Sequence, residues 1–266
     1  MDYIQFCEKI WRDWHAEKLS IDGDRVLKTL EKKLDYDACP EPYLSFGECD
    51  DYNKTLFFLT TNPGQVLEFQ KRSNILSGKS FIEPGKGYKE ISLDLGTYYE
   101  TGNHVKPASN ESIILRNPKD HISKMKKLAN LLGFENFVEI ETIPFHSHDL
   151  PKNRIPELAE KNPEEAITSI YFKSVREFLS DKNVICVQAA GSDCKLSDWL
   201  NWLMKRIIGI EEPKSHILKT LNNKTTVSLI LDTADQKLIR GLTLKNGAKG
   251  LPESLEKIAY IIKNRC

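Results

Sequence analysis

Strand-like and helix-like segments alternate along most of this chain, and the alternation limits the folds open to it. The strand-like runs are rich in β-branched and other apolar residues, whereas the segments between them carry apolar residues at helical spacing. This order is typical of βαβ units. We therefore expect an α/β fold, a three-layer α/β/α sandwich around a central four-stranded, mostly parallel sheet. The expected strands are 55–61, 137–144, 183–190 and 225–232, and the expected helices are 119–132, 163–180, 196–209 and 252–264.

Two segments depart from this order. Residues 1–38 have helical periodicity with a break at Ser20–Gly23, which predicts an N-terminal helical extension ahead of an α/β domain over 39–266. Residues 74–118 are polar and rich in glycine and tyrosine, and they predict a long loop. Loops of this length in compact domains are commonly functional. Because the segment follows the end of the first strand, we expect it to contribute to binding.

The amino-acid composition argues against several classes of function. The 38 basic and 38 acidic side chains cancel, so no overall field attracts nucleic acid or membrane. Hydrophobic residues make up 40% of the chain and charged residues 29%, as in globular proteins. No apolar run approaches the roughly 20 residues of a membrane helix. The start resembles no signal peptide, and the six cysteines form no Cys-x-x-Cys pair. We expect a cytoplasmic protein without membrane, cofactor, metal or protein partner.

The first strand ends in a distinctive turn, Asn62-Pro63-Gly64. Proline fixes φ and glycine permits conformations that other residues avoid, so the turn is rigid. In open parallel sheets, ligands bind beyond the carboxyl ends of the strands. A polar side chain held there can orient a water molecule or contact a substrate. The alternative is an ordinary turn in which Asn62 caps a helix.

Polar residues also follow the other predicted strands, and parallel strands would bring them to one edge. They are His146, Ser147, His148 and Asp149 after the second strand, Gly191, Ser192 and Asp193 after the third, and Asp232 after the fourth. Histidine titrates near neutrality and can act as a general acid or base. The alternative for each histidine is a local hydrogen bond. A metal-dependent hydrolase is a further alternative, with His146, His148 and Asp149 as metal ligands. Their spacing alone is weak evidence for a metal site.

Other catalytic motifs are missing from the sequence. It contains no Gly-x-Ser-x-Gly elbow, no phosphate-binding Gly-x-x-x-x-Gly-Lys and no dinucleotide fingerprint after a strand. A basic, glycine-containing segment follows the last predicted strand, and its side chains can contact DNA phosphates. Its basic residues are Lys237, Arg240, Lys245 and Lys249.

Taken together, the Asn62-Pro63-Gly64 turn after an apolar strand, the aromatic-bearing segment and the strand order resemble the uracil-DNA glycosylase superfamily, in its mismatch-specific and single-strand-selective branches. The resemblance covers residues 40–262, but only the first motif is specific. It implies an enzyme that flips a base out of DNA and hydrolyses its N-glycosidic bond. It also implies that Asn62 places the attacking water or contacts the base, that Pro63, Gly64 and Gln65 line the pocket, and that Phe69, Phe81 or Tyr98 stacks on the base. Asp149 and Ser192 are further candidates for substrate contact.

The chain departs from this family in its second motif. Asp232–Gln236 stand where His-Pro-Ser is typical, so His146 or His148 is the expected donor to the leaving base, and the Lys237–Leu251 segment the expected wedge. The long polar segment suits a bulky base, such as the glucosylated hydroxymethylcytosine that antiviral relatives attack in phage DNA. A non-catalytic nucleic-acid or nucleotide-binding module of the same fold is the alternative.

Overall fold

The computed structural model describes most of the chain. The described residues are 1–47, 49–64, 66–105, 112–114, 120–147, 149–189, 198–211, 215–222, 225–230, 239, 242–246 and 255–264.

Seven strands within this part of the chain form one sheet, in the order β1-β5-β2-β6-β9-β8-β7. The four central strands, β5, β2, β6 and β9, are mutually parallel, whereas β1 at one edge and β8 and β7 at the other are antiparallel to their neighbours. The α/β class is therefore confirmed. The strands are β1 (Tyr43–Phe46), β2 (Thr55–Thr60), β5 (Asn136–Glu141), β6 (Val184–Ala189), β7 (Ser215–Asn222), β8 (Thr225–Ile230) and β9 (Leu242–Asn246); β3 (Asn103–Val105) and β4 (Ser112–Ile114) pair separately.

The fourth parallel strand differs from the one that the sequence predicts. The predicted strand 225–232 contains β8, which runs antiparallel to β9, and β9 lies in a segment that was expected to be a loop. Strand β8 consequently ends at the opposite edge of the sheet from β2, β5, β6 and β9. The expectation that the predicted strand 225–232 runs parallel to the others is therefore wrong, and Asp232 lies outside the described residues.

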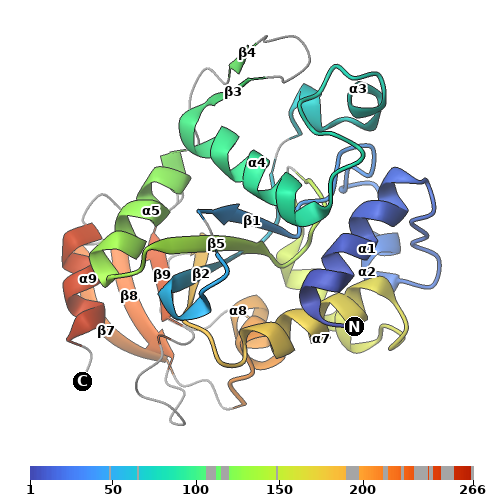
Figure 1. Ribbon diagram of the computed structural model, residues 1–266. Helices are drawn as coiled ribbons and strands as arrows, with labels where there is room; N and C mark the ends of the chain where they lie inside the picture. The colour runs from blue at the N-terminus through green and yellow to red at the C-terminus, as the bar shows by residue number, and fades with distance from the viewer. Residues whose placement is uncertain are drawn as a thin grey trace.

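Helices cover both faces of the sheet, as Figure 1 shows with α5 above it and α7 and α8 below. Neighbouring residues of a strand point to opposite faces. Phe178 of α7 packs against Phe57 on one face, and His121 of α5 lies 3.7 Å from Glu139 on the other. The helices are α1 (Tyr3–His15), α2 (Arg25–Leu30), α3 (Arg72–Leu76), α4 (Tyr88–Thr101), α5 (Asp120–Leu132), α6 (Ile155–Glu160), α7 (Ile167–Leu179), α8 (Asp198–Leu203) and α9 (Leu255–Lys263).

Helix α4 lies where the sequence predicts a polar loop, so that prediction is wrong. Its buried side chains recur at helical spacing, and Gly102 ends it with a left-handed φ of 74°. Two of its tyrosines bury their rings and still bond their hydroxyls, Tyr88 to the carbonyl of Tyr43 and Tyr99 to Glu41. Tyrosine thus serves here as a core residue. Gly96 lets the helix approach β1 closely, because a Cβ there would overlap the carbonyl oxygen of Ser45.

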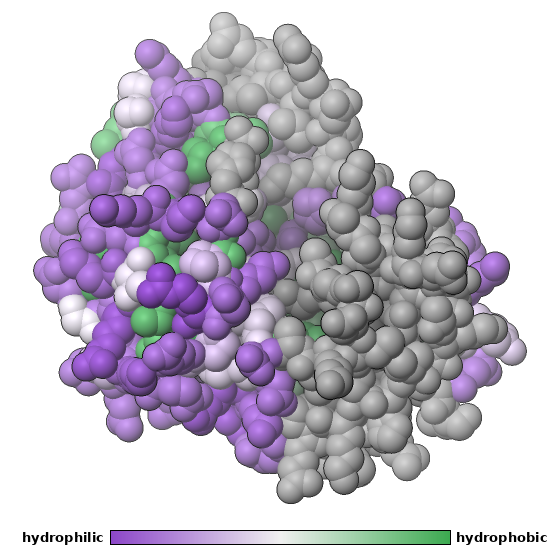
Figure 2. Space-filling view, turned by 180° about the vertical axis from the view of Figure 1, so that it is seen from behind, coloured by the Kyte–Doolittle hydropathy of each residue, from purple (hydrophilic) through white to green (hydrophobic). Residues whose placement is uncertain are grey.

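The N-terminal helices share the core of the sheet. Asp2 and Gln5 form a capping box that begins α1. Trp11 and Trp14 are 1% exposed and belong to the same hydrophobic cluster as the strand residues. The surface differs from this core, since the described part of the face in Figure 2 is mostly hydrophilic with scattered hydrophobic spots. No helix in the described ranges has the length and apolar character that crossing a bilayer requires.

Candidate active site at the carboxyl edge of the parallel strands

The turn after β2 lies against the segment that follows β5. The backbone N–H groups of Ile143 and Ser147 donate to the carbonyls of Thr61 and Gly64, at 2.8 and 3.1 Å. The side-chain amide of Asn62 donates to the carbonyl of Ser147 at 2.8 Å. The parallel pairing of β2 with β5 therefore brings the two polar segments together at one edge, as their order in the sequence predicts.

The backbone of the turn is conformationally restricted. Pro63 is buried, and Gly64 has a φ of 79°, a conformation that glycine adopts without strain. The helical turn that follows begins at Glu68, with Leu67 at its N-cap position. Asn62 is thus no cap of that turn, because a capping side chain accepts from backbone N–H groups whereas its amide donates to a carbonyl. The side chain is fixed by the neighbouring segment instead.

His146 points into the protein. Its side chain is 1% exposed, and Nε2 lies 3.7 Å from Glu41 Oε1 and 3.4 Å from Gln70 Nε2. Tyr99 donates to Glu41 Oε1 at 2.8 Å, and the amide of Gln70 donates both to that oxygen and, at 2.6 Å, to the Tyr99 hydroxyl. Buried Cys39 lies beside them. We call these five residues the Glu41 cluster: Cys39, Glu41, Gln70, Tyr99 and His146.

Backbone bonds fix the Glu41 cluster in place. The N–H of Cys39 donates to the carbonyl of Gln70 at 2.9 Å, and the N–H of Glu41 donates to the carbonyl of Pro144 at 2.8 Å. Burial, followed by the nearby Glu41 carboxylate, raises the pKa of the Tyr99 hydroxyl and of the Cys39 thiol well above their ordinary values. Tyr99 therefore stays a protonated hydrogen-bond donor to Glu41 at neutral pH.

Little in the sequence pointed to this cluster. Glu41 lies between two prolines just after the predicted N-terminal helices, and neither it nor Gln70 had an expected role. Tyr99 lay in the segment that was expected to be a binding loop, not a helix with buried tyrosines. A glutamate that two prolines hold in extended backbone just before a strand was the one available signal.

The three aromatic residues that were expected to stack on a base lie together. The ring centroids of Phe69, Phe81 and Tyr98 are 4.7 to 5.1 Å apart. Phe69 precedes Gln70 and Tyr98 precedes Tyr99, so this trio adjoins the Glu41 cluster. All three are buried, and Phe69 has the largest exposed fraction, 7%, against 1% for Phe81 and 2% for Tyr98. Phe69 is therefore the ring closest to the surface.

Asp149 does not join the other candidates. Its side chain is 84% exposed and pairs with Lys33 at 3.3 Å, whereas His146 is buried. The two residues thus point to different environments, which does not favour a metal centre made of His146, His148 and Asp149. Gln65, His148, Ser192, Lys237, Arg240 and Lys249 lie outside the described residues. Lys245 is in β9, one residue before Asn246, which pairs with Ala189 at the end of β6.

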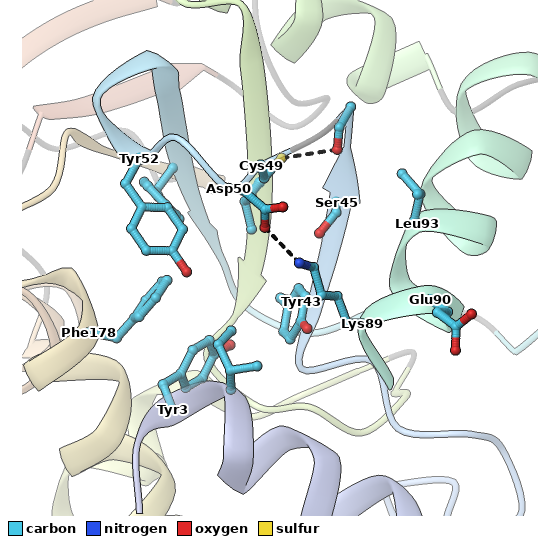
Figure 3. Close-up of a pocket in the computed structure, with 14 residues that line it drawn as sticks. Tyr3, Tyr43, Ser45, Cys49, Asp50, Tyr52, Lys89, Glu90, Leu93 and Phe178 are labelled. Carbon is cyan, nitrogen blue, oxygen red and sulfur yellow. Dashed lines mark hydrogen bonds and ion pairs between the residues drawn. The ribbon is translucent and has the colours of Figure 1, made fainter. Parts of the chain in front are cut away.

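A separate cavity of about 410 Å³ opens between α1, α4, α7 and the start of β2. Aromatic side chains such as Tyr52 and Phe178 form one wall, and the ion pair of Lys89 with Asp50, 2.6 Å long, crosses it (Figure 3). None of the site residues predicted from the sequence lines this cavity. It lies toward the amino ends of the strands, away from the Asn62 turn.

Comparison of the chain with protein-family models, with curated proteins and with solved structures gives no match.

Proposed function

We propose that this protein is a monofunctional DNA glycosylase that flips out a uracil-like or modified pyrimidine and hydrolyses its N-glycosidic bond, leaving an abasic site. The observation that carries the proposal is the Asn62-Pro63-Gly64 turn at the carboxyl end of β2. This strand lies between parallel β5 and β6, and the segment after β5 holds the turn in place. Carboxyl ends of central parallel strands are where ligands bind in such sheets.

Asn62 has the chemistry that the reaction needs. Its NH₂ group is engaged by the carbonyl of Ser147, and that bond also orients the Oδ1 atom of the same planar amide. In the proposed reaction Oδ1 holds a water molecule or contacts the base. The water attacks C1′ of the deoxyribose, the electrons of the C1′–N bond leave with the base, and the proton that the water loses passes to the departing base.

The leaving base requires a hydrogen-bond donor. His146 is buried against Glu41 and Gln70, so we assign it a positioning role in the segment after β5 rather than direct contact with the base. His148 is the donor in this proposal, on the basis of the sequence alone. Phe69 is the proposed stacking residue because it is the most exposed ring of its trio.

The direction of β9 supports DNA contacts at this edge. Lys245 is near the carboxyl end of β9, and Lys249 follows four residues later in the sequence. Lysines in the segment from β9 onward are proposed to contact phosphates on either side of a flipped nucleotide. The described cysteines Cys7, Cys39 and Cys49 are free thiols, which supports the cytoplasmic location expected from the sequence. Action on modified phage DNA in antiviral defence is part of the proposal.

Base release tests the proposal directly. We expect the protein to release a free base from uracil-containing DNA or from phage DNA with glucosylated hydroxymethylcytosine, as measured by mass spectrometry, and not from plain DNA. Asn62→Ala should lower the rate by at least about 100-fold, because it removes the group that orients the water or the base. The proposal fails if no DNA of the panel loses a base.

A matched variant separates catalysis from folding. Asn53→Ala changes an exposed asparagine on the short turn before β2 and should leave the rate unchanged. Both variants should melt as cooperatively as the parent chain. Equal rates for Asn62→Ala and Asn53→Ala would contradict the role of Asn62.

A further inference from the structure

Three groups of the Glu41 cluster have the chemistry of metal ligands. The sulfur of Cys39, a carboxylate oxygen of Glu41 and a ring nitrogen of His146 all lie within 4.8 Å of one another. The three residues are 0%, 0% and 1% exposed. A thiolate, an imidazole and a carboxylate are the three side-chain types that bind zinc in proteins.

The spacing of these groups fits a tetrahedral ion. Zinc ligands lie about 2.0–2.3 Å from the metal, which places them roughly 3.3–3.8 Å from each other. Nε2 of His146 is already 3.7 Å from Oε1 of Glu41. The sulfur of Cys39 lies within 4.8 Å of these ligand groups, so a movement of about 1 Å or less brings it to this spacing. The Tyr99 hydroxyl donates to Glu41 Oε1 at 2.8 Å and holds this carboxylate in position beside His146.

Glu41 is the group that most requires a cation. Its Oε1 atom accepts hydrogen bonds from Gln70 and Tyr99, but among the described residues Oε2 has no hydrogen-bond partner although it is buried. A buried carboxylate oxygen without a partner is costly. The charges of one divalent ion, one thiolate and one carboxylate sum to zero, so the ion would leave no net charge in the interior.

The backbone already presents the ligands. Only Pro40 separates Cys39 from Glu41, and this segment bonds to Gln70 on one side and to Pro144 on the other. His146 is tied to the same region, since its carbonyl accepts from the N–H of Asp35 at 2.9 Å. Three chain segments distant in sequence therefore meet at the cluster before any ion binds.

We propose that Cys39, Glu41 and His146 bind one zinc ion as a structural site. The ion joins the segment before β1 to the segment after β5, and the latter segment holds Asn62 through Ser147. The three ligands are buried, so the ion itself would not contact DNA, and its effect on the proposed activity would be limited to the position of the segment that holds Asn62.

Metal content tests the proposal. The full chain, purified without a histidine tag or chelator, should contain about one zinc per molecule by inductively coupled plasma mass spectrometry. Growth with cobalt should give an intense sulfur-to-cobalt absorption band in the near ultraviolet. Zinc content below about one-tenth per chain, with no rise in the melting temperature on adding zinc, would overturn the site and identify the cluster as a hydrogen-bond network only.

Two cysteine variants locate the ion. Cys39→Ser should lose the cobalt band and most of the zinc, whereas Cys186→Ser, which changes an equally buried thiol in β6, should retain both. If Cys39→Ser does not fold, Glu41→Gln keeps the size of the side chain and should still lower the zinc content at least tenfold. A folded variant of either kind with full zinc content would contradict the assignment. Asn62→Ala should retain its zinc, so failure of the glycosylase proposal leaves this test intact.

Discussion

The buried carboxylate of Asp24 satisfies the N-termini of two helices at once. It is 1% exposed and accepts from the N–H of Leu27 at 3.0 Å in α2 and from the N–H of Thr168 at 2.7 Å in α7. The hydroxyl of Thr168 and the amide of Asn162 also donate to it. The first N–H groups of a helix lack partners within the helix, and a negative charge there is favourable. One side chain thus joins α2 to α7.

We expect Asp24→Ala to lower the free energy of unfolding by about 2–4 kcal/mol, because it removes a cap and leaves buried donors without partners. Urea unfolding followed by circular dichroism measures the change. Asp22→Ala is the control, since its side chain is 88% exposed and its contact with Lys28 is 3.9 Å long. That variant should change stability by less than about 0.5 kcal/mol. Equal losses for the two variants would refute the capping argument.

Helix α4 and strand β1 form the closest backbone contact described above. Ordinarily glycine within a helix costs up to about 1 kcal/mol relative to alanine, so replacing it would stabilise the helix. At Gly96 we expect the same replacement to destabilise the protein instead. The added methyl group meets the backbone carbonyl of Ser45, and a β-strand paired in a sheet cannot move away. The steric clash between α4 and β1 therefore outweighs the gain in helix propensity.

Gly96→Ala should therefore destabilise the protein by about 2 kcal/mol or more, from overpacking against backbone. Gly85→Ala is the matched control, since a Cβ at Gly85 meets nothing within 4 Å. We expect that second change to be neutral or slightly stabilising, because it restricts the unfolded chain. Thermal melting of the two variants provides the comparison. A Gly96→Ala protein as stable as the parent would show that α4 can move away from β1.

Across the described residues, the hydrophobic core extends continuously from α1 through the sheet. Tyr3 lies 6.0 Å from Tyr43 of β1 and 5.9 Å from Tyr171 of α7, measured between ring centroids. Trp14 also bonds through its indole N–H to the carbonyl of Tyr36. Removing α1 would expose apolar side chains of β1, α4 and α7 to water.

The chain 39–266 is therefore expected to lose cooperative folding, although the sequence suggested that these residues form a domain of their own. Its circular dichroism melt should be broad, and it should bind a hydrophobic dye that the full chain does not. A sharp melt near the temperature of the full chain would instead show that residues 1–38 are a dispensable extension.

Local patterns in the sequence predicted much of this fold. The strand expected at 55–61 is β2 (Thr55–Thr60), and the helix expected at 119–132 is α5 (Asp120–Leu132), because both depend on uninterrupted runs or regular spacing of apolar residues. The meeting of Asn62 with the segment around His146 followed from strand direction. The assignment of function stays a prediction.

The features that the sequence did not predict depend on distant contacts. Helix α4 buries tyrosines because strand β1 and Glu41 accept their hydroxyl hydrogen bonds, and no local pattern records those partners. Strand β9 is short and glycine-flanked, and its place beside β6 is fixed by pairing across the chain. The inward direction of His146 likewise depends on Glu41, more than a hundred residues away.

The position of α4 also bears on how copies of this chain can associate. The outward carbonyl of Tyr43 accepts from the hydroxyl of Tyr88, and the outward carbonyl of Ser45 is covered closely by α4 at Gly96. A strand from a second molecule would need those same acceptors and the same space. Growth of the sheet into dimers or fibres is thus blocked at the β1 edge for as long as α4 stays folded.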